Sequence, residues 1–544
     1  MSVRLRQLGD RTFTGASLVS VVLIAAALAA ILGPMLARGV TAVIFHDTVE
    51  FRKMQFDMHK RGDAEEVRAE TAAVDAARKP VYGLFDNFAH GVDTELLQDE
   101  ATQAYRDLGD ELDRRLVSPA QRREVRALAR TLRDALIEAY QATDRATAEE
   151  HLARVLEHAG NERLTGTAAT RLFDYARSYG EHLRTLDFAR RAEYASALAE
   201  VKEALRRLLG PHPGEPPSST LAMDQYGATR MDMADRALDD LLYAEKWVAT
   251  EPGRPLVKQR IPREEQFAGT RLAALFPYVR EHLDEMLRPR LTFYGQYFWD
   301  DSIPGHYFGG IGPEILGTLA LVALAILFAF PVGLVSAAYL VEVAGDDPPI
   351  RFLRMCINTL AGVPSIVFGL FGLAFFVYYI TGKPCVLAAS LTLAVLILPV
   401  VIRASEEAIR AVPTAYKEAA LALGASRFRC FVTVQLPAAL PGVLTGVILS
   451  MSRAAGETAP VLFTGAIAFG PALNLLKWPA GGWLFDQTRT LSYGAYDVAV
   501  GDRLAALVPH QQYGMVATLI VLVLLLNLTA IILRWRISKK LHGA

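Results

Sequence analysis

The sequence predicts an all-α membrane protein with six transmembrane helices and a large helical extracytoplasmic insert after the first of them. Three observations predict this fold. Between positions 41 and 310 the chain carries 83 of its 115 charged residues, so one segment is far more polar than the rest. Several long stretches outside that segment contain no charge at all. Basic residues gather at both termini, as they do on the cytoplasmic side of membrane proteins.

Composition excludes several classes of protein. The chain has 544 residues and a net charge of −1, whereas a dedicated nucleic-acid binder shows a strong basic excess. The segment 41–310 holds 46 acids and 37 bases, and the remaining residues hold 12 acids and 20 bases. A soluble enzyme confined to one compartment does not show this partition. The cysteines (Cys356, Cys385 and Cys430) form neither a disulfide framework nor a zinc-ligand spacing.

The charge-free stretches are long enough to cross a bilayer, which takes roughly 20 apolar helical residues. The expected spans are 17–36, 315–341, 362–380, 386–402, 438–459 and 513–533. The alternative for the first is a cleaved signal peptide. Its apolar run is too long for that and shows no small-residue cleavage site before Arg38, so an uncleaved anchor is expected.

A further charge-free run, 458–476, is interrupted by two prolines and two glycines. We expect it to be the end of the fifth span followed by a re-entrant or external loop, and not a seventh span. The interrupting residues are Pro460, Gly465, Gly470 and Pro471.

Flanking bases predict the orientation, with both termini in the cytoplasm and an even number of spans. Six spans place 37–314 outside, and they place 342–361 and 403–437 in the cytoplasm. The expected domains are 1–40 (N-terminus and first span), 41–310 (extracytoplasmic helical domain), 311–535 (transmembrane domain) and 536–544 (cytoplasmic tail). The terminal bases are Arg4, Arg6, Arg11, Arg534, Arg536, Lys539 and Lys540.

The insert 41–310 is expected to be helical. Segments 120–138 and 185–209 place apolar residues three and four positions apart among Arg and Glu. The run 212–218, rich in proline, indicates a turn between two helical groups, and no β-hairpin pattern competes. A spacer or docking bundle is favoured over a ligand sensor, because the insert shows no phosphate-binding glycine cluster, metal-ligand spacing or nucleophile motif.

The second cytoplasmic loop predicts a helical hairpin within 405–437. Pro413 suits the first position of a helix over 414–423, since its missing N–H is not needed there. Gly424 stands where a left-handed residue ends such a helix, and a second short helix, 425–435, leads back to the membrane. The alternative is an ordinary loop between two spans.

The hairpin resembles the EAA motif of ABC importer permeases, with Val at one position where Ile is usual. In that family the hairpin lies in a groove of the ATPase subunit and transmits its movement to the spans. Two residues of the motif are alanines, so a partner can approach the backbone closely. The matching residues are Glu418, Ala419, Ala420, Gly424, Val434, Gln435, Leu436 and Pro437.

Three further strings, 360–370, 398–407 and 452–460, resemble the PstA-type permease subunit of the phosphate ABC importer, and the likeness covers about 311–535. The resemblance implies a second related permease subunit, two ATPase subunits that use ATP and magnesium, and an extracytoplasmic phosphate-binding protein. The chain lacks a GxxxxGK[ST] phosphate loop, so it is expected to have no ATPase activity, cofactor or metal of its own. The insert of about 250 residues departs from typical members, which have a short loop there.

Arg453 is expected at membrane depth, where an arginine costs about 2.5–3.5 kcal/mol on an insertion scale. Glu457 follows at i+4, so the two side chains share a helical face. Either the two form a structural ion pair or Arg453 meets an oxyanion in the pathway, for which its fork of donors is suited. Arg403 either snorkels to the interface or lines the pathway. The resemblance implies a substrate pathway containing Arg403, Arg453, Glu457 and Thr458.

The function expected from these residues is that of a permease subunit importing inorganic phosphate. One alternative is an importer for another oxyanion such as sulfate, molybdate or a phosphonate. The other is a membrane receptor with a ligand-sensing outer domain. Six spans without a sizeable cytoplasmic domain disfavour the receptor.

Overall fold

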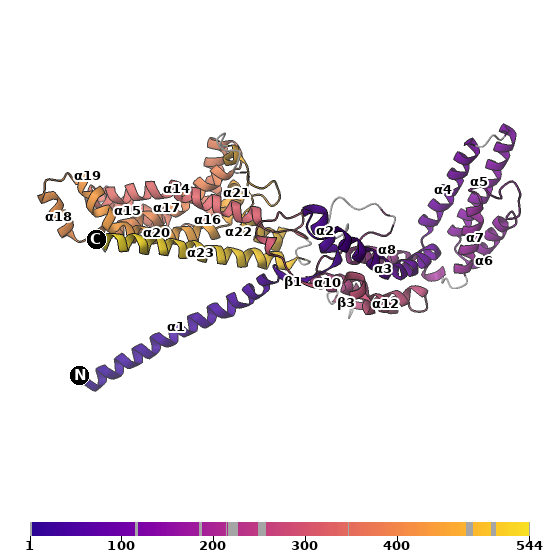
Figure 1. The fold of residues 1–544 in the computed structure, drawn as a ribbon, viewed down its shortest axis with the longest axis horizontal. Coiled ribbons are helices and arrows are strands. Elements are labelled where there is room, and N and C mark those ends of the chain that lie inside the picture. Colours follow the sequence, from indigo (N-terminus) through magenta and orange to yellow (C-terminus); the bar gives the residue numbers. More distant parts are fainter. Residues whose placement is uncertain are drawn as a thin grey trace. The chain divides into compact units, whose positions relative to one another are not determined.

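Two compact units make up the computed structural model of the chain (Figure 1). The membrane unit comprises Met1–Phe45 and Leu291–Ala544, and the insert unit comprises His46–Arg290. The insert unit thus lies within the expected range 41–310. The structure describes residues 3–114, 118–183, 188–213, 215, 227–248, 257–345, 347–474, 482–501 and 508–542.

Long apolar helices dominate the membrane unit. Five stretches of the described residues are long and apolar enough to cross a membrane, and they are Gly15–Val40, Gly312–Glu342, Val386–Arg410, Arg427–Gly456 and Pro509–Lys539. The helices that contain them are α1 (Val3–Val40), α14 (Gly312–Glu342), α17 (Val386–Arg410), α19 (Arg427–Cys430), α20 (Leu436–Gly456) and α23 (Pro509–His542). The prediction of an all-α membrane protein is confirmed.

Shorter elements connect these helices. They are η3 (Gly295–Phe298), α15 (Pro348–Leu360), α16 (Ser365–Gly372), the π-helical η4 (Leu373–Thr381), α18 (Thr414–Ala422), the π-helical η5 (Phe431–Gln435), α21 (Ala459–Thr464), η7 (Gly482–Phe485), α22 (Leu491–Tyr496) and the π-helical η8 (Asp497–Gly501).

The third predicted span, 362–380, corresponds to the second arm of a bent pair. α15 and the helix Ser365–Thr381 meet at an angle of 101°. Pro364 caps the second arm, and a proline disfavours helical geometry in the residue before it. Within its described residues the membrane unit therefore has five helices long and apolar enough to span a membrane, or six if the bent pair counts as one span.

Small residues bring α17 close to its neighbours. A Cβ on Gly442 would lie 2.7 Å from Cβ of Ala408, and one on Gly446 would clash with Ala404. The two contacts place α17 and α20 antiparallel, with residue 404 opposite 446 and residue 408 opposite 442. Gly333 of α14 approaches Val401 in the same way. Such close packing is the main attraction between helices in lipid, where burial of apolar surface contributes little.

The run 458–476 does not form a long helix in its described part. Its only helix is α21, which has six residues and follows a break after Gly456. Beyond Gly465 the chain is irregular, and Ala466 forms a bridge with Thr488. The segment is therefore not a seventh span over the residues described, as predicted; residues 475 and 476 lie outside them.

The insert unit is mainly helical. Its helices are α2 (Val49–His59), α3 (Ala64–Val92), α4 (Thr94–Arg114), α5 (Pro119–Gln141), α6 (Arg145–Leu156), α7 (Thr170–Leu183), η1 (Phe188–Arg190), α8 (Arg191–Leu209), α10 (Met231–Leu242), α11 (Arg263–Gln266), η2 (Arg271–Ala274), α12 (Leu275–Glu281) and α13 (Leu283–Leu287).

The expected spacing of apolar residues produces the core of the insert unit. In α5, which contains the predicted segment 120–138, Val125, Ala129, Leu132 and Leu136 are buried on one face. Of the predicted segment 185–209, α8 forms the part from Arg191 onward. In the predicted linker 212–218, the described residues lie outside any helix, and residues 214 and 216–218 are outside the described part.

Four strands accompany the helices. β1 (Ile44–Asp47) pairs with β4 (Arg290–Phe293), and β2 (Tyr243–Val248) pairs with β3 (Val257–Pro262) as an antiparallel hairpin. The expectation that no β-hairpin forms in the insert was therefore wrong. The hairpin was not predicted because β3 is largely exposed. It therefore lacks the alternation of apolar and polar residues that marks a half-buried strand.

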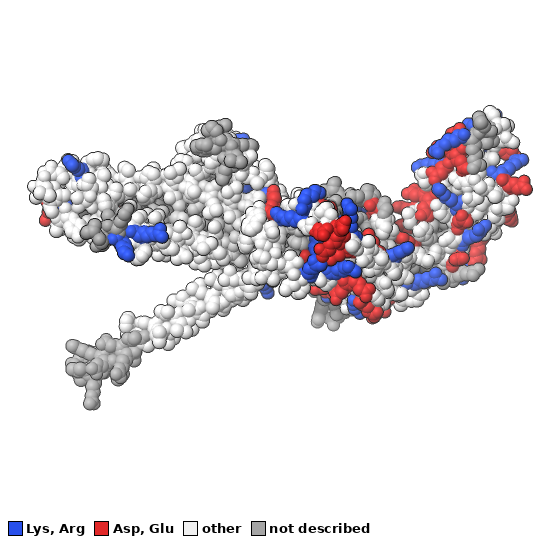
Figure 2. Space-filling view, viewed as in Figure 1, with Lys and Arg blue, Asp and Glu red and all other residues white. Residues whose placement is uncertain are grey.

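The two units differ in how many charged side chains their surfaces carry. Figure 2 shows acidic and basic side chains spread over the insert unit, whereas the visible face of the membrane helices is almost free of them. The insert unit's surface is therefore suited to water, and the faces of α14, α17, α20 and α23 are suited to lipid and to one another.

A histidine of the insert unit should make its stability depend on pH. Nε2 of His90 lies 3.2 Å from Oε1 of Glu100, and this hydrogen bond raises the pKa of His90 to about 9. Because the folded pKa exceeds the ordinary value near 6.5, the stabilisation is complete below about pH 6.5 and is lost as pH rises through about 9. Both side chains are partly exposed, so we expect about 1 kcal/mol.

Thermal unfolding of the full chain at pH 6.5 and pH 9.5 measures this effect. The parent should lose about 1 kcal/mol more than His90→Gln between the two pH values, because titrations elsewhere are common to both proteins. Equal losses in the two proteins would contradict the prediction.

Candidate functional site

The hairpin between α17 and α20 has the predicted helix–glycine–helix form. α17 runs to Arg410, eight residues beyond the predicted end of the fourth span, so Arg403 lies within a helix. Pro413 caps α18 with an extended backbone and so stands one position earlier than predicted. Gly424 is left-handed, with φ of +85°, as predicted. A side chain at position 424 would meet no atom within 4 Å.

The second arm differs from the prediction. α19 begins after Ser426, whose hydroxyl accepts from the N–H of Arg429, and it continues through η5 into α20 without a break. Leu436 and Pro437 were expected to follow a short helix ending at Gln435, but they form the first turn of α20. The N–H of Leu436 bonds back five residues to Phe431, and this wider turn precedes a proline that cannot donate. The hairpin is thus joined rigidly to a long helix.

A buried carboxylate ties both arms of the hairpin to α14. Glu342, at the end of α14, pairs with Nζ of Lys417 at 2.6 Å and accepts from Nε2 of Gln435 at 3.0 Å. Its side chain is 11% exposed, so these contacts are shielded from solvent. Glu342 was not among the residues predicted from the sequence. Its position as the only acid closing a charge-free run is the signal that could have drawn attention to it.

Large apolar side chains are exposed on the hairpin, among charged ones, over the described residues. α18 has no buried residue, and Leu423 and Phe428 are 90% and 77% exposed. Glu418 and Ala419 are exposed, and Ala420 is partly so. Exposed large apolar residues that gather in this way mark an interaction surface.

Arg453 and Glu457 form the expected ion pair, but the backbone that joins them is not the continuous helix that was predicted. α20 ends at Gly456, and Glu457 follows in an extended conformation, so the two do not share a helical face. The carboxylate still returns to the guanidinium, with Nε of Arg453 3.5 Å from Oε1 of Glu457. The two side chains are 36% and 19% exposed. Within the described residues the guanidinium makes no hydrogen bond, so its donors remain available.

The structure separates the predicted pathway arginines. By the register of α17 and α20, Arg453 is level with residue 397, six residues from Arg403, or about 9 Å along the helix axis. Arg403 is exposed and has no ion pair within the described part of the chain. Thr458 directly follows Glu457 and caps α21. The four predicted residues therefore lie at two levels, with Arg453, Glu457 and Thr458 at one and Arg403 at the other.

A second ion cluster, around the buried side chain of Arg489, was not predicted from the sequence. Arg489 is 3% exposed in its side chain and pairs with Asp301 and, at 3.5 Å, with Glu314. Its guanidinium also donates to Oγ of Ser302 at 3.2 Å. The partners are 188 and 175 positions away in sequence, so no local pattern could reveal them.

Apolar helices packed through small residues, with an exposed hairpin between two of them, define a multi-pass membrane protein. Residues 329–543 match the family of binding-protein-dependent transport system inner membrane components. The chain is 35% identical over 243 residues to the probable ABC transporter permease protein YqgI of Bacillus subtilis (strain 168). That match covers 43% of this chain and 80% of the relative. The chain belongs to this family of ABC transporter permeases, whose members are transporters.

Phosphate transport system permeases are also similar. PstA 1 of Mycobacterium tuberculosis (strain CDC 1551 / Oshkosh) is 37% identical over 182 residues, which are 33% of this chain and 59% of the relative. PstA of Mycobacterium leprae (strain TN) is 39% identical over 169 residues, which are 30% of this chain and 55% of the relative. The chain spans little more than half the length of these two relatives.

Proposed function

We propose that this chain is the permease subunit of an ABC importer that brings inorganic phosphate into the cell. The observation that carries the substrate assignment is the half-buried guanidinium of Arg453, whose donors make no hydrogen bond within the described residues. The phosphate transport permeases among the relatives support the same substrate. Arg453 would receive phosphate through paired hydrogen bonds, and Glu457 would hold the arginine when substrate is absent.

Phosphate would meet polar groups at two levels. Arg453 and the hydroxyl of Thr458 form one level, and Arg403 forms the other, about 9 Å nearer the hairpin. Successive sites of moderate strength suit a path that must both bind and release an anion.

Coupling would begin at the hairpin. Glu418, Ala419 and Ala420 of α18 would meet the ATPase, because they are exposed or partly exposed and two of them are small. Movement of the ATPase would reach α14 through Glu342. It would reach Arg453 through the unbroken helix Arg427–Gly456, along which Arg453 lies about 39 Å from the hairpin end.

The assembly that follows would contain three kinds of protein partner beside the lipid bilayer. This chain would pair with a second related permease, two ATPase subunits would bind at the cytoplasmic side and hydrolyse ATP with magnesium, and a phosphate-binding protein would deliver substrate outside. The chain itself would hold no cofactor and catalyse no reaction.

Labelled-phosphate uptake into vesicles containing the complete complex tests the proposal, with labelled sulfate measured alongside. We expect phosphate uptake that depends on ATP, and sulfate uptake at background. A preference for sulfate would overturn the phosphate assignment and leave the permease family intact. No ATP-dependent uptake of either anion would overturn the importer proposal.

The topology is a separate prediction. With the bent pair counted as one span the described residues supply six, and we expect both termini in the cytoplasm because basic residues flank both terminal spans. Reporters fused at Gly9 and His542 should both indicate cytoplasm, and one near Pro213 should indicate the outside. Opposite signals at Gly9 and His542 would mean that α15 and α16 together do not cross the membrane.

A further inference from the structure

A cavity in the insert unit has the chemistry of an anion site. It has a volume of about 210 Å³ and lies between α3, α7, η1, α8 and the loop that leads into η2. That space suits a ligand of a few non-hydrogen atoms and is below the range of drug-sized pockets.

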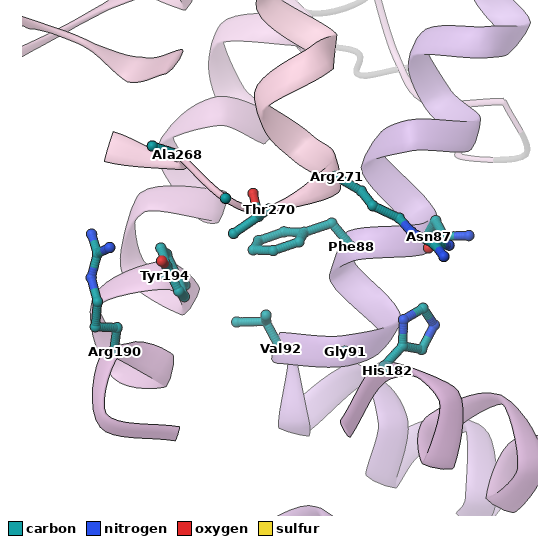
Figure 3. A pocket seen from close by; sticks show the side chains of 11 residues that line it. Asn87, Phe88, Gly91, Val92, His182, Arg190, Tyr194, Ala268, Thr270 and Arg271 are labelled. Carbon is teal, nitrogen blue, oxygen red and sulfur yellow. The ribbon is translucent and has the colours of Figure 1, made fainter. Parts of the chain in front are cut away.

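The polar groups that line the cavity are donors or neutral, and none is a carboxylate. Figure 3 shows the side chains of Asn87, His182 and Arg271 on one side of the space, with Arg190 and Tyr194 on the other. Arg190 is paired with Glu193, so the excess positive charge at this small cavity comes from the guanidinium of Arg271.

The two arginines differ in how firmly they are held. Arg190 donates to the carbonyl of Gln266 at 3.1 Å, pairs with Glu193 at 3.4 Å and lies over the ring of Tyr194. Arg271 is exposed and makes no hydrogen bond or ion pair within the described residues. Arg190 is thus a fixed wall of the cavity, and Arg271 has all its donors available for a ligand.

The walls of the cavity are rigid. Phe88 packs edge-on against Tyr194 and against Phe267, with ring centres 5.8 and 5.6 Å apart. Gly269 adopts a left-handed backbone, with φ of +81°, in the loop that carries Arg271 to the rim. A preformed cavity binds a small ligand with little cost of ordering.

The electrostatics of His182 agree with a positive site. The pKa of His182 is lowered, first by burial and then by the neighbouring cations His90 and Arg271. Burial disfavours a charge of either sign, so only the contribution of the neighbouring cations indicates a positive site.

We propose that this cavity binds a small oxyanion, of the phosphate or carboxylate kind, with Arg271 as the principal ligand and Asn87 as a second donor. The site lies in the insert unit, apart from Arg453, and the inference does not depend on the transport function proposed above.

Calorimetry on the full chain in lipid nanodiscs at constant 0.15 M KCl tests this site, with inorganic phosphate and acetate as separate probes. All measurements use an Arg453→Gln background, so that the membrane unit's own arginine does not contribute. We expect saturable binding of at least one probe, with one anion per chain. Arg271→Gln removes the free guanidinium and should weaken binding about ten- to a hundredfold, as expected for a charge-assisted hydrogen bond.

Two further variants keep the result interpretable. Asn87→Asp leaves both arginines in place and puts a negative charge at the rim, so it should also weaken binding at least about tenfold. Arg280→Gln removes an exposed arginine of α12 that does not line the cavity, and binding should stay within about twofold of its parent. Saturable binding of neither probe, or equal losses in Arg271→Gln and Arg280→Gln, would overturn the proposal.

Discussion

An importer assembled with Ala420→Glu should lose nearly all ATP-driven uptake, although the variant chain inserts normally. Ala420 lies on the exposed hairpin helix α18, where a small residue allows a partner to approach the backbone. A glutamate there adds bulk and a charge that the interface would have to bury, a change that costs several kcal/mol. Uptake and co-purification of the ATPase should fall together. The matched control is Ala411→Glu, at an exposed position before the hairpin helix, which should keep uptake close to the parent rate.

The turn of the same hairpin offers a second, purely conformational test. Gly424 has φ of +85° with no atom within reach of an added Cβ, so any loss comes from the backbone and not from a clash. A β-branched residue in this region costs about 1–3 kcal/mol, whereas asparagine adopts it readily. Gly424→Val should reduce uptake at least about tenfold, and Gly424→Asn should remain near the parent. Full uptake by membrane-inserted Ala420→Glu and Gly424→Val would remove the docking role of the hairpin.

Arg453→Gln should reduce phosphate uptake about a hundredfold without affecting assembly. The loss of two charge-assisted hydrogen bonds to a migrating oxyanion accounts for an effect of this size. Arg453→Lys keeps the charge and loses the planar fork, so it should retain some uptake, at about a tenth of the parent rate. Vesicles holding the complete complex and labelled phosphate give both values.

Two controls separate a pathway role from a structural one. Arg351→Gln removes an exposed arginine from the first turn of α15 and should leave uptake unchanged. Glu457→Gln should raise the ATP consumed per phosphate transported more than it raises the KM for phosphate, because Arg453 loses its resting partner at 3.5 Å. Phosphate uptake at the parent rate in Arg453→Gln would assign the arginine a structural role and place the path elsewhere.

Much of the membrane unit follows from composition alone. The charge-free runs predict the spans because a bilayer selects for length and apolarity without regard to neighbours. The bend before Ser365 could not be located in this way, since α15 and the following helix are long and apolar enough to cross a membrane only when taken together. The hairpin β2–β3 was missed for a related reason. Its strands are recognisable through their partners, such as Trp247 opposite Lys258, and not through their own periodicity.

The residues of the candidate site likewise differ in whether the local sequence predicts their role. The left-handed Gly424 was predictable because a helix end imposes a local requirement on the backbone. The role of Glu342 was not, because Lys417 and Gln435 lie 75 and 93 positions further along the chain. Glu457 was predicted to share a helix with Arg453. The two side chains form an ion pair, although α20 ends at Gly456, one residue before Glu457. Features that depend on residues a few positions apart can therefore be predicted from the sequence. Contacts between residues far apart in the sequence cannot, because they form only when the helices pack.

The paired strands β1 and β4 have a consequence for how such a chain could arise. Within the membrane unit the N–H of Tyr294 donates to the carbonyl of Val43 at 2.7 Å, although 250 residues separate them along the chain. The points where the polypeptide leaves and rejoins this unit are thus adjacent, and a turn of a few residues could close the gap. Joining ends that are already in contact leaves the surrounding fold unstrained, which is the condition under which whole domains are gained or lost in one genetic event.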